Sequence, residues 1–425
     1  MKKATTFAID NFTSFRLKML NWCGRFNIFC LLDNNGYNFD TPAFECLLAV
    51  GCTARLKTNA GNAFDALKAF STAQQNWLFG HLGYDLKNET SPLQSNNFDG
   101  IGFKDIHFFV PETVLQLNKQ KLTVYCEENA EQVFAAIQSC EEFKETITAP
   151  VIIFNRFTEE EYVNIVQKLQ QHILRGDCYE VNFCQEFFST DAVIDPVTVY
   201  QKLMQLSPSP FAALYKTDEH YCICASPERY LKKAGNKIFS QPIKGTSKRC
   251  LTDEYLDEKS RQQLLNSEKE RTENVMVVDL VRNDLSKVCK QGTVQVDELF
   301  GVYSFPQVHQ MISTISGTLK EGLDWTNVVR ASFPMGSMTG APKLRVMQLI
   351  EQYERTKRGL FSGAIGYVDP QGNCDFNVVI RSILYNAATR YLSFQTGSAI
   401  TFYSDAAMEY EECLLKAAAL KKILQ

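Results

Sequence analysis

The chain has 425 residues, of which 45% are apolar and 22% charged, as expected for a globular protein with one large domain or two ordinary ones. Its net charge of −4 excludes the basic surface that nucleic-acid binding requires. The longest apolar stretches, such as residues 26–32, are far too short to cross a membrane, and we find no signal-peptide pattern. We therefore expect a cytoplasmic protein that binds neither nucleic acid nor membranes.

Cysteine and histidine give no sign of a zinc site or a disulfide framework. The 14 cysteines are scattered without a Cys-x-x-Cys spacing, and the five histidines do not cluster. This pattern is typical of cysteines that serve as small buried hydrophobic residues in a reducing compartment.

The first 150 residues predict a mixture of strands, loops and helices. Residues 77–85 read as a strand interrupted by glycines, and residues 121–125 alternate as a strand does. Asn, Ser and Pro over 88–100 predict a loop, and 131–144 predict a helix. We place a boundary near residue 150, between an N-terminal region (1–150) and a second region (151–425).

In the second region, Thr158 and the glutamates that follow it form a capping box for a helix that continues to about Arg175. Further helices are expected over 268–281, 325–333, 343–358 and 409–424, and strands over 176–188, 221–224, 230–232, 237–240, 294–299, 364–369, 376–385 and 390–397. These elements predict an α/β (α+β) protein with large, mainly antiparallel sheets.

One lysine has an unusual local setting. Lys244 lies in the segment Gln241-Pro-Ile-Lys-Gly-Thr246, between a strand-like and a helix-like run. Pro242 fixes one backbone dihedral angle and Gly245 frees another, so a constrained turn presents the lysine. This setting favours a nucleophile, and the alternative is an ordinary solvated lysine.

Two pairs of glutamates share a spacing. Glu270 and Glu273 lie three residues apart on one expected helix, and Glu409 and Glu412 repeat this spacing on the last helix. Each pair shares a helix face, and two such faces across a cleft would offer four carboxylates to a hard cation such as Mg²⁺. The alternative is two solvated acidic faces. Lys416, four residues after Glu412, fits either a helix ion pair or a ligand contact.

Five segments occur in a characteristic order. They are Ser226-Pro-Glu-Arg229, Pro242-Ile-Lys-Gly-Thr246, the helical segment 268–284, Gly336-Ser-Met-Thr-Gly-Ala-Pro-Lys343, and Ser404-Asp405 with Glu409-Tyr-Glu-Glu412 and Lys416. Through these segments the chain resembles the chorismate-utilising enzymes, strongly over about residues 155–420 and weakly before them. The resemblance implies an anthranilate synthase component I-like fold, in which two large, mainly antiparallel sheets pack as a sandwich with helices on the outside.

The third position of the Pro242–Thr246 motif distinguishes branches of this family. Lysine there is typical of the enzymes that replace the C4 hydroxyl of chorismate with an amino group, giving 4-amino-4-deoxychorismate for 4-aminobenzoate and folate synthesis. The anthranilate-forming and isochorismate-forming branches usually carry alanine there, and the latter has a base-like lysine where this chain has Glu180. The alternatives are an anthranilate-forming enzyme and a non-catalytic regulator that binds chorismate or tryptophan.

The resemblance implies a covalent mechanism. Lys244 attacks C2 of the chorismate ring while Glu228 protonates the departing C4 hydroxyl, and ammonia then adds at C4 and expels the lysine. The implied substrate contacts are Arg381, Tyr367, Ser337, Thr339, Gly397 and Lys416. Arg381 suits a carboxylate because its guanidinium binds in a bidentate manner, although a structural arginine is the alternative.

The resemblance also implies a Mg²⁺ cofactor. The ion would lie between Glu273, Glu412 and the ring carboxylate, with Glu270 and Glu409 assisting through water. Without the cation, the carboxylates of protein and substrate would repel one another strongly.

Lys244 must lose a proton to attack, whereas Glu228 must keep one to donate it. A lysine pKa of about 10.4 would have to fall by about 3.4, which costs about 4.6 kcal/mol, for half deprotonation at pH 7. Burial favours the neutral amine and the substrate carboxylates oppose it, so the alternative is a base that takes the proton during attack. Burial or negative charge would raise the Glu228 pKa, and the alternative is that Glu228 forms a salt bridge with Arg229 or another basic group.

Several positions depart from the family pattern. Gln310 replaces a histidine, Ser398 and Ala399 interrupt the glycine-rich segment that begins at Gly397, and Glu186 replaces an arginine. No Gly-x-Cys-x-Gly segment of a glutaminase is present. Ammonia would therefore come from solution or from a separate glutamine amidotransferase subunit, which is the implied partner.

Overall fold

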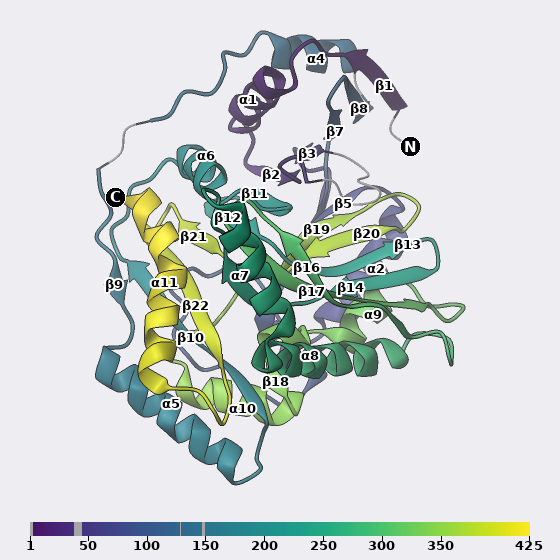
Figure 1. Cartoon of the computed structure of the whole chain (residues 1–425). Coiled ribbons are helices and arrows are strands. Elements are labelled where there is room, and N and C mark those ends of the chain that lie inside the picture. The colour runs from purple at the N-terminus through teal and green to yellow at the C-terminus, as the bar shows by residue number, and fades with distance from the viewer. Residues whose placement is uncertain (1–2, 38–44, 128, 147–148) are drawn as a thin grey trace.

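Two large antiparallel sheets form the body of the protein (Figure 1). The computed structural model describes residues 3–37, 45–127, 129–146 and 149–425, and over these residues sheet A has twelve strands and sheet B has ten. Sheet A has the order β1 (Lys3–Ala8), β8 (Lys121–Cys126), β7 (Thr113–Asn118), β3 (Cys46–Val50), β2 (Ile28–Asp33), β11 (Phe211–Thr217), β12 (His220–Ser226), β21 (Ser382–Asn386), β22 (Tyr391–Ile400), β10 (Glu180–Ser189) and β18 (Gly340–Ala341), with β9 (Phe154–Asn155) paired to β10. Sheet B has the order β15 (Ile243–Lys248), β17 (Val308–Thr318), β14 (Lys237–Gln241), β13 (Arg229–Ala234), β20 (Cys374–Asn377), β19 (Ala364–Val368), β5 (Leu78–Leu82), β6 (Ile106–Val110) and β4 (Ala54–Thr58), with β16 (Gln295–Ser304) paired to β17.

Helices surround these sheets. They are α1 (Phe12–Cys23), α2 (Ala63–Gln74), α3 (Lys87–Thr90), α4 (Ala130–Gln138), α5 (Glu159–Leu174), α6 (Pro196–Leu206), α7 (Glu254–Asn266), α8 (Glu268–Ser286), α9 (Trp325–Ser332), α10 (Lys343–Tyr353) and α11 (Ala406–Leu424), with 3-10 turns η1 (Tyr84–Leu86) and η2 (Gly336–Met338). Figure 1 shows α5 and α11 on the outer side of β10 and β22. None of these helices, within the described ranges, is long and apolar enough to span a bilayer.

The two faces of sheet A belong to two hydrophobic cores. Along β2, the side chains of Ile28, Cys30 and Leu32 join the core shared with sheet B. Phe29 and Leu31, which alternate with them, join the core shared with helices that include α1, α5, α6 and α11. This arrangement confirms the predicted sandwich of two antiparallel sheets with helices on the outside.

Strands from both sides of residue 150 share both sheets. In sheet A, β2 pairs with β11, and in sheet B, β5 pairs with β19. The boundary near residue 150 therefore separates two stretches of sequence whose strands are hydrogen-bonded to each other.

Local capping explains why several helices begin where the sequence predicts. The Thr158 hydroxyl accepts a hydrogen bond from the Glu161 amide, and the Glu161 carboxylate accepts one from the Thr158 amide, so the capping box at the start of α5 is confirmed. Helix α8 begins at Glu268, as predicted, where the Ser267 side chain accepts a hydrogen bond from the Glu270 amide.

The prediction of one continuous strand over 376–385 is wrong. The chain leaves sheet B after β20 and enters sheet A at β21. Between them, the Val378 amide donates to the Glu228 carbonyl, and Arg381 adopts a left-handed φ of 52°. This break positions the segment that carries Arg381.

Two helices end earlier than predicted. Helix α4 ends at Gln138, and α10 ends at Tyr353, five residues before Arg358. The residues after α10 have a buried role instead, because Glu354 and Arg358 form an ion pair of 2.6 Å in the interior.

Candidate active site

Lys244 lies where the edge of sheet B meets sheet A. It belongs to β15, and its Nζ atom is 2.6 Å from Oε1 of Glu180, the first residue of β10. The Lys244 side chain is 11% exposed and the Glu180 side chain 1%. The sequence alternative of a solvated surface lysine is therefore excluded.

Gly245 lets the Lys244 strand approach α8 closely. Its φ is 95°, and a Cβ at this position would lie 3.0 Å from Oε2 of Glu270 and 3.1 Å from Cδ1 of Leu264. A larger residue would be strained by both its backbone and its neighbours. Glycine after Lys244 thus brings the amine next to the acidic start of α8.

Carboxylates around Lys244 outweigh the effect of burial on its charge. Burial lowers the pKa of Lys244, but the negative charges of Glu180, Glu273 and Glu228 raise it, and the net change is upward. The resting side chain is therefore an ammonium ion. Burial alone therefore does not give the free amine, and of the two routes that the sequence left open this favours the one in which a base takes the proton.

Glu228 also favours its protonated form, in which it is neutral. It lies between β12 and β13 and is 4% exposed, and burial raises its pKa to about 7, although the Ser337 hydroxyl and the Lys244 charge lower it. The Ser337 hydroxyl donates to Glu228 Oε1 at 2.6 Å. Arg229 forms an ion pair with Asp375 at 2.9 Å. Glu228 can thus hold a proton near neutral pH, as an acid for the leaving hydroxyl must.

The Gly336–Lys343 motif forms η2 and β18 beside this carboxyl group. The Thr339 hydroxyl is fully buried and donates only to backbone carbonyls, so it supports the turn rather than facing Glu228. The Asn182 amide nitrogens donate to the carbonyls of Ser337 and Thr339, at 3.0 and 2.8 Å. Arg358 donates to the carbonyls of Met338 and Asn182, and so ties the turn to β10.

Three of the four predicted metal-binding glutamates, Glu270, Glu273 and Glu412, lie close enough for their charges to affect one another's pKa values. Glu270 and Glu273 lie on α8, where burial raises the pKa of both, that of Glu273 to about 7. Glu412, on α11, also raises the Glu270 pKa. Burial raises the pKa of Glu412 itself, but Lys416 at 2.6 Å outweighs burial and the net change is downward. Glu409 is buried one turn earlier on α11.

These glutamates offer donors that suit a hard cation. All are carboxylate oxygens, and Oε1 of Glu273 is buried without a hydrogen-bond partner. In the arrangement seen over the described ranges, no three His, Cys, Asp or Glu side chains converge closely enough to hold a metal ion. The donor type fits Mg²⁺, and Lys416 stands beside Glu412 as a competing cation.

Gly397 and Lys416 lie together beside this acidic group. Lys416 Nζ donates to the Gly397 carbonyl at 2.9 Å. A Cβ at Gly397 would lie 2.1 Å from the Phe183 carbonyl, so β22 and β10 can pair there only through glycine. Ser398 and Ala399 continue β22 with no positive φ, so these departures do not strain the backbone.

Of the two predicted contacts for the side-chain carboxylate, only Arg381 faces the acidic group. Burial lowers the Arg381 pKa and the Glu412 charge opposes this change, and no ion pair is seen for Arg381 within the described residues. Tyr367 instead packs against Trp77 and Phe79, with ring centroids 5.8 and 6.0 Å away. The structure thus does not bring Tyr367 to Lys244.

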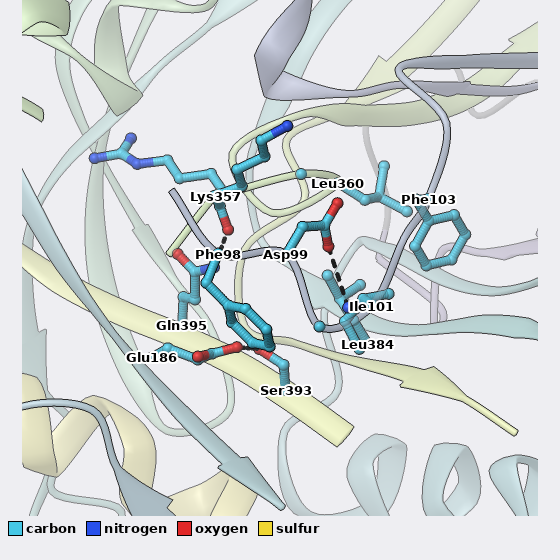
Figure 2. Close-up of a pocket in the computed structure, with 13 residues that line it drawn as sticks. Phe98, Asp99, Ile101, Phe103, Glu186, Lys357, Leu360, Leu384, Ser393 and Gln395 are labelled. Atoms are coloured by element: carbon cyan, nitrogen blue, oxygen red, sulfur yellow. Dashed lines mark hydrogen bonds between the residues drawn. The ribbon is translucent and has the colours of Figure 1, made fainter. Parts of the chain in front are cut away.

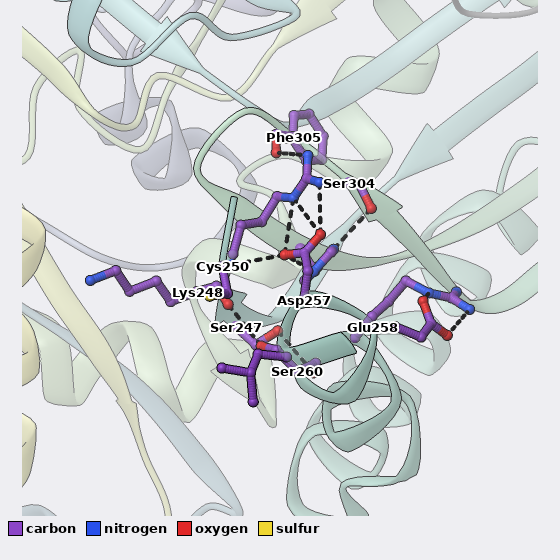
Figure 3. Close-up of polar contacts among 12 residues, drawn as sticks. Ser247, Lys248, Cys250, Asp257, Glu258, Ser260, Ser304 and Phe305 are labelled. Atoms are coloured by element: carbon purple, nitrogen blue, oxygen red, sulfur yellow. Dashed lines mark hydrogen bonds and ion pairs between the residues drawn. The ribbon is translucent and has the colours of Figure 1, made fainter. Parts of the chain in front are cut away.

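Gln310 and Glu186 are the remaining positions that depart from the family pattern. Gln310 is buried opposite Thr246 of β15, and its Oε1 has no hydrogen-bond partner. The neighbouring His309 faces the other way, 3.2 Å from Asp257 of α7, and its second ring nitrogen lies 2.9 Å from Ser304 Oγ. Figure 3 shows this network, in which Arg249 also donates to Asp257 and ties α7 to the β16–β17 hairpin.

Glu186 lines a separate small pocket with Phe98, Lys357, Ser393 and Gln395 (Figure 2). The Arg156 side chain donates to Glu186 Oε2 at 2.6 and 3.0 Å, and the Ser393 hydroxyl donates to Oε1 at 2.7 Å. The charge reversal at Glu186 is therefore balanced locally by Arg156, and of the residues assigned above to the Lys244 site only Arg358 also lines this pocket.

Three residues of the site lack a predicted role in the sequence. Glu180 contacts the Lys244 amine, and Asn182 and Arg358 hold the turn that carries Ser337. The one signal for Glu180 was the resemblance, which places a base-like lysine of the isochorismate-forming branch at this position. Nothing in the local sequence marks Asn182 or Arg358.

Comparison with known proteins identifies the family. Residues 29–422 match the family described as chorismate binding enzyme. The chain is 31% identical over 367 residues to aminodeoxychorismate synthase component 1 of Bacillus subtilis, covering 83% of this chain and 77% of the relative. It is 32% identical over 369 residues to anthranilate synthase component 1 of Aquifex aeolicus, covering 82% and 74%. The crystal structure of anthranilate synthase component I from Streptococcus pneumoniae TIGR4 superposes with a TM-score of 0.79 at 25% identity, covering 92% and 94%.

A buried lysine among carboxylates, on this sandwich fold, defines an enzyme site of the chorismate-utilising type. The chain belongs to the family of chorismate binding enzymes. Chorismate is therefore its substrate class, and the particular product depends on the chemistry around Lys244.

Proposed function

We propose that this enzyme converts chorismate and ammonia to 4-amino-4-deoxychorismate, the activity of an aminodeoxychorismate synthase component 1. One observation carries the proposal: the primary amine of Lys244 is buried 2.6 Å from one carboxylate and within the field of the acid Glu228. A structural lysine would have no need of a neighbouring carboxyl group with a pKa of about 7. The B. subtilis relative supports this branch of the family.

The reaction uses Lys244 twice. Its neutral amine forms a bond to C2 of the ring as the bond from C4 to the hydroxyl breaks, and Glu228 gives its proton to the departing oxygen to form water. Ammonia then bonds to C4, and the C2–N bond breaks to release the lysine amine. The ammonium group on C4 gives a proton back to Glu228, which restores the acid.

Charge complementarity supports the binding mode. Arg381 would bind one substrate carboxylate, and Lys416 and the Gly397 backbone would line the same side of the site. Glu270, Glu273, Glu409 and Glu412 would hold Mg²⁺, with Lys416 released from Glu412. When bound, the ion supplies positive charge that offsets the repulsion between these glutamates and a ring carboxylate of chorismate.

Ammonia would be supplied by a separate glutamine amidotransferase subunit, because the chain carries no glutaminase motif. The product would serve 4-aminobenzoate and folate synthesis. Mixing the enzyme with such a subunit should give glutamine-dependent turnover. If free ammonium supports turnover but the amidotransferase subunit does not stimulate it, the proposal of this partner is contradicted.

Mass spectrometry of the products tests the proposed reaction. Incubation with chorismate, ammonium and Mg²⁺ should give 4-amino-4-deoxychorismate, and Lys244→Ala should abolish its formation. Fluorescent anthranilate as the product would instead support the activity named for the A. aeolicus relative. Undiminished amination by Lys244→Ala would overturn the covalent role of the lysine.

A further inference from the structure

Among the described residues, the Glu180 carboxylate is hydrogen-bonded to one side chain, that of Lys244. Its Oε1 accepts a hydrogen bond from Lys244 Nζ at 2.6 Å, and its Oε2 is buried without any hydrogen-bond partner. The side chain is 1% exposed, so bulk solvent does not reach the second oxygen. The Glu180 carboxylate can therefore accept a further hydrogen bond, and it contacts Lys244 Nζ, the atom that must lose a proton in the proposed reaction.

A contribution to folding stability does not explain the buried Lys244–Glu180 ion pair well. Removing two charges from water usually costs as much as their attraction returns, and replacement by apolar residues is often neutral or stabilising. An incompletely hydrogen-bonded carboxylate makes this balance worse. Such a group is expected where chemistry requires it.

We propose that Glu180 is the catalytic base that takes a proton from Lys244 before the amine attacks, and returns it after each turnover; this inference rests on the proposed function. The Lys244 ammonium and the Glu180 carboxylate become an amine and a carboxylic acid. The amine then forms its bond to C2 of the ring. When ammonia has displaced the lysine from C2, the released amine takes its proton back from Glu180. The charge of the pair is thus restored, and no external oxidant or reductant is involved.

The other carboxylates near Lys244 are less suited to this role. Glu228 is already bonded to the Ser337 hydroxyl, and it must carry a proton rather than accept one. Glu273 lies 4.0 Å from Lys269 and belongs to the group proposed to hold Mg²⁺. Among the charges near Lys244, that of Glu180 has the largest upward effect on the Lys244 pKa, followed by that of Glu273.

Charged groups from every neighbouring element must be considered for the pH dependence. Those that face Lys244 are Glu180 of β10, Glu228 between β12 and β13, Glu270 and Glu273 of α8, and Glu412 of α11. Replacing Glu180 with glutamine also removes a negative charge that raises the pKa values of Lys244 and Glu273, so the pH profile of this variant includes a lower pKa for both groups.

The test is the rate of 4-amino-4-deoxychorismate formation by the full chain with saturating chorismate, ammonium and Mg²⁺. Glu180→Gln keeps an acceptor of the same shape but removes the base, and should lower kcat about 10²- to 10⁴-fold at pH 7. Because the free amine then arises only by loss of a proton to water, this deficit should shrink about tenfold for each unit of rising pH. Glu180→Asp should retain more activity than Glu180→Gln at every pH.

Glu321→Gln is a matched control, because it removes a carboxylate from an exposed pair with Lys290, 2.9 Å apart, away from the site. It should leave kcat and its pH profile unchanged. Equal unfolding midpoints for the Glu180 variants and the wild type would show that losses in rate are not losses of fold.

A Glu180→Gln enzyme within about threefold of the wild-type kcat would overturn the base role. A deficit that is the same at every pH, or that lies in KM alone, would also overturn it, because a residue that only positions Lys244 gives that result. Either outcome leaves the proposed function intact if the wild type aminates chorismate and Lys244→Ala does not. Absence of amination by the wild type would instead remove the proposed function, and this inference with it.

Discussion

Lys244 and Glu228 both favour their protonated forms, for different physical reasons. Burial raises the pKa of Glu228 to about 7, whereas surrounding carboxylates raise that of Lys244 in spite of its burial. The resting site therefore holds both protons that the reaction must move. In the proposed reaction, one would be removed from Lys244 and the other given to the leaving hydroxyl.

The Ser337 hydroxyl tunes the acid, and its removal should be visible in the pH profile. Its hydrogen bond favours the ionised form of Glu228, so Ser337→Ala should raise the Glu228 pKa above about 7. A hydrogen bond to a charged group corresponds to about one pH unit or slightly more. The alkaline limb of kcat/KM should move up by about this amount, and an unmoved limb would contradict the assignment of Glu228 as the acid.

Burial of Glu228 should also cost stability at high pH. Its pKa rises on folding from 4.5 to about 7, so the folded state favours the protonated form. Stability is complete below the unfolded pKa and is lost as pH rises through the folded one, by about 3 kcal/mol in total. Glu228→Gln should thus be inactive but more stable than the wild type at pH 8, with little difference at pH 4.5. Denaturant unfolding at a series of pH values measures this, and a difference independent of pH would refute it.

At the scale of elements, local signals explain what the sequence predicted. The capping box of α5 and the start of α8 depend on neighbouring residues, and both were correctly predicted. The early end of α10 and the break between β20 and β21 depend on distant partners, such as the carbonyls that Arg358 contacts. The role of Glu180 was not predictable for the same reason, because β10 meets β15 only in the folded protein.

Gly245 links the nucleophile strand to α8, and its replacement should damage both. Gly245→Ala would place a Cβ 3.0 Å from Glu270 Oε2 at a φ of 95°, and should cost about 1–3 kcal/mol with loss of most activity. Gly235→Ala is a matched control, since Gly235 has a φ of 58° and a Cβ added there would meet no atom within 4 Å. The control should lose about 1 kcal/mol at most and keep its kcat. Equal losses of activity in the two variants would contradict the close-approach explanation.

Mg²⁺ would connect α8 with α11, and its binding should be measurable without turnover. The ion should raise the unfolding temperature in proportion to the logarithm of its concentration once above its Kd. Glu273→Gln should abolish this increase, and chelation of Mg²⁺ should abolish amination. An unfolding temperature that is insensitive to Mg²⁺ would contradict the proposed cation.

At the scale of the whole molecule, the two stretches of chain on either side of residue 150 complete each other's sheets. A fragment of residues 151–425 would leave β11 and β19 without their partners β2 and β5. It would also expose the part of the core that the first 150 residues cover. We expect this fragment to be aggregated or unfolded by size-exclusion chromatography and circular dichroism, and a cooperative, monomeric fragment would refute this.

The pairing of β5 with β19 has a consequence for synthesis on the ribosome. About 280 residues separate these neighbours, which corresponds to about 15–60 s of translation at ordinary speed. During that time the buried residues of β5 lie at an open sheet edge, with only the early partner β6 in place. The nascent chain therefore has to keep this apolar edge from aggregating until its last quarter emerges, and should depend on chaperones that shield such edges.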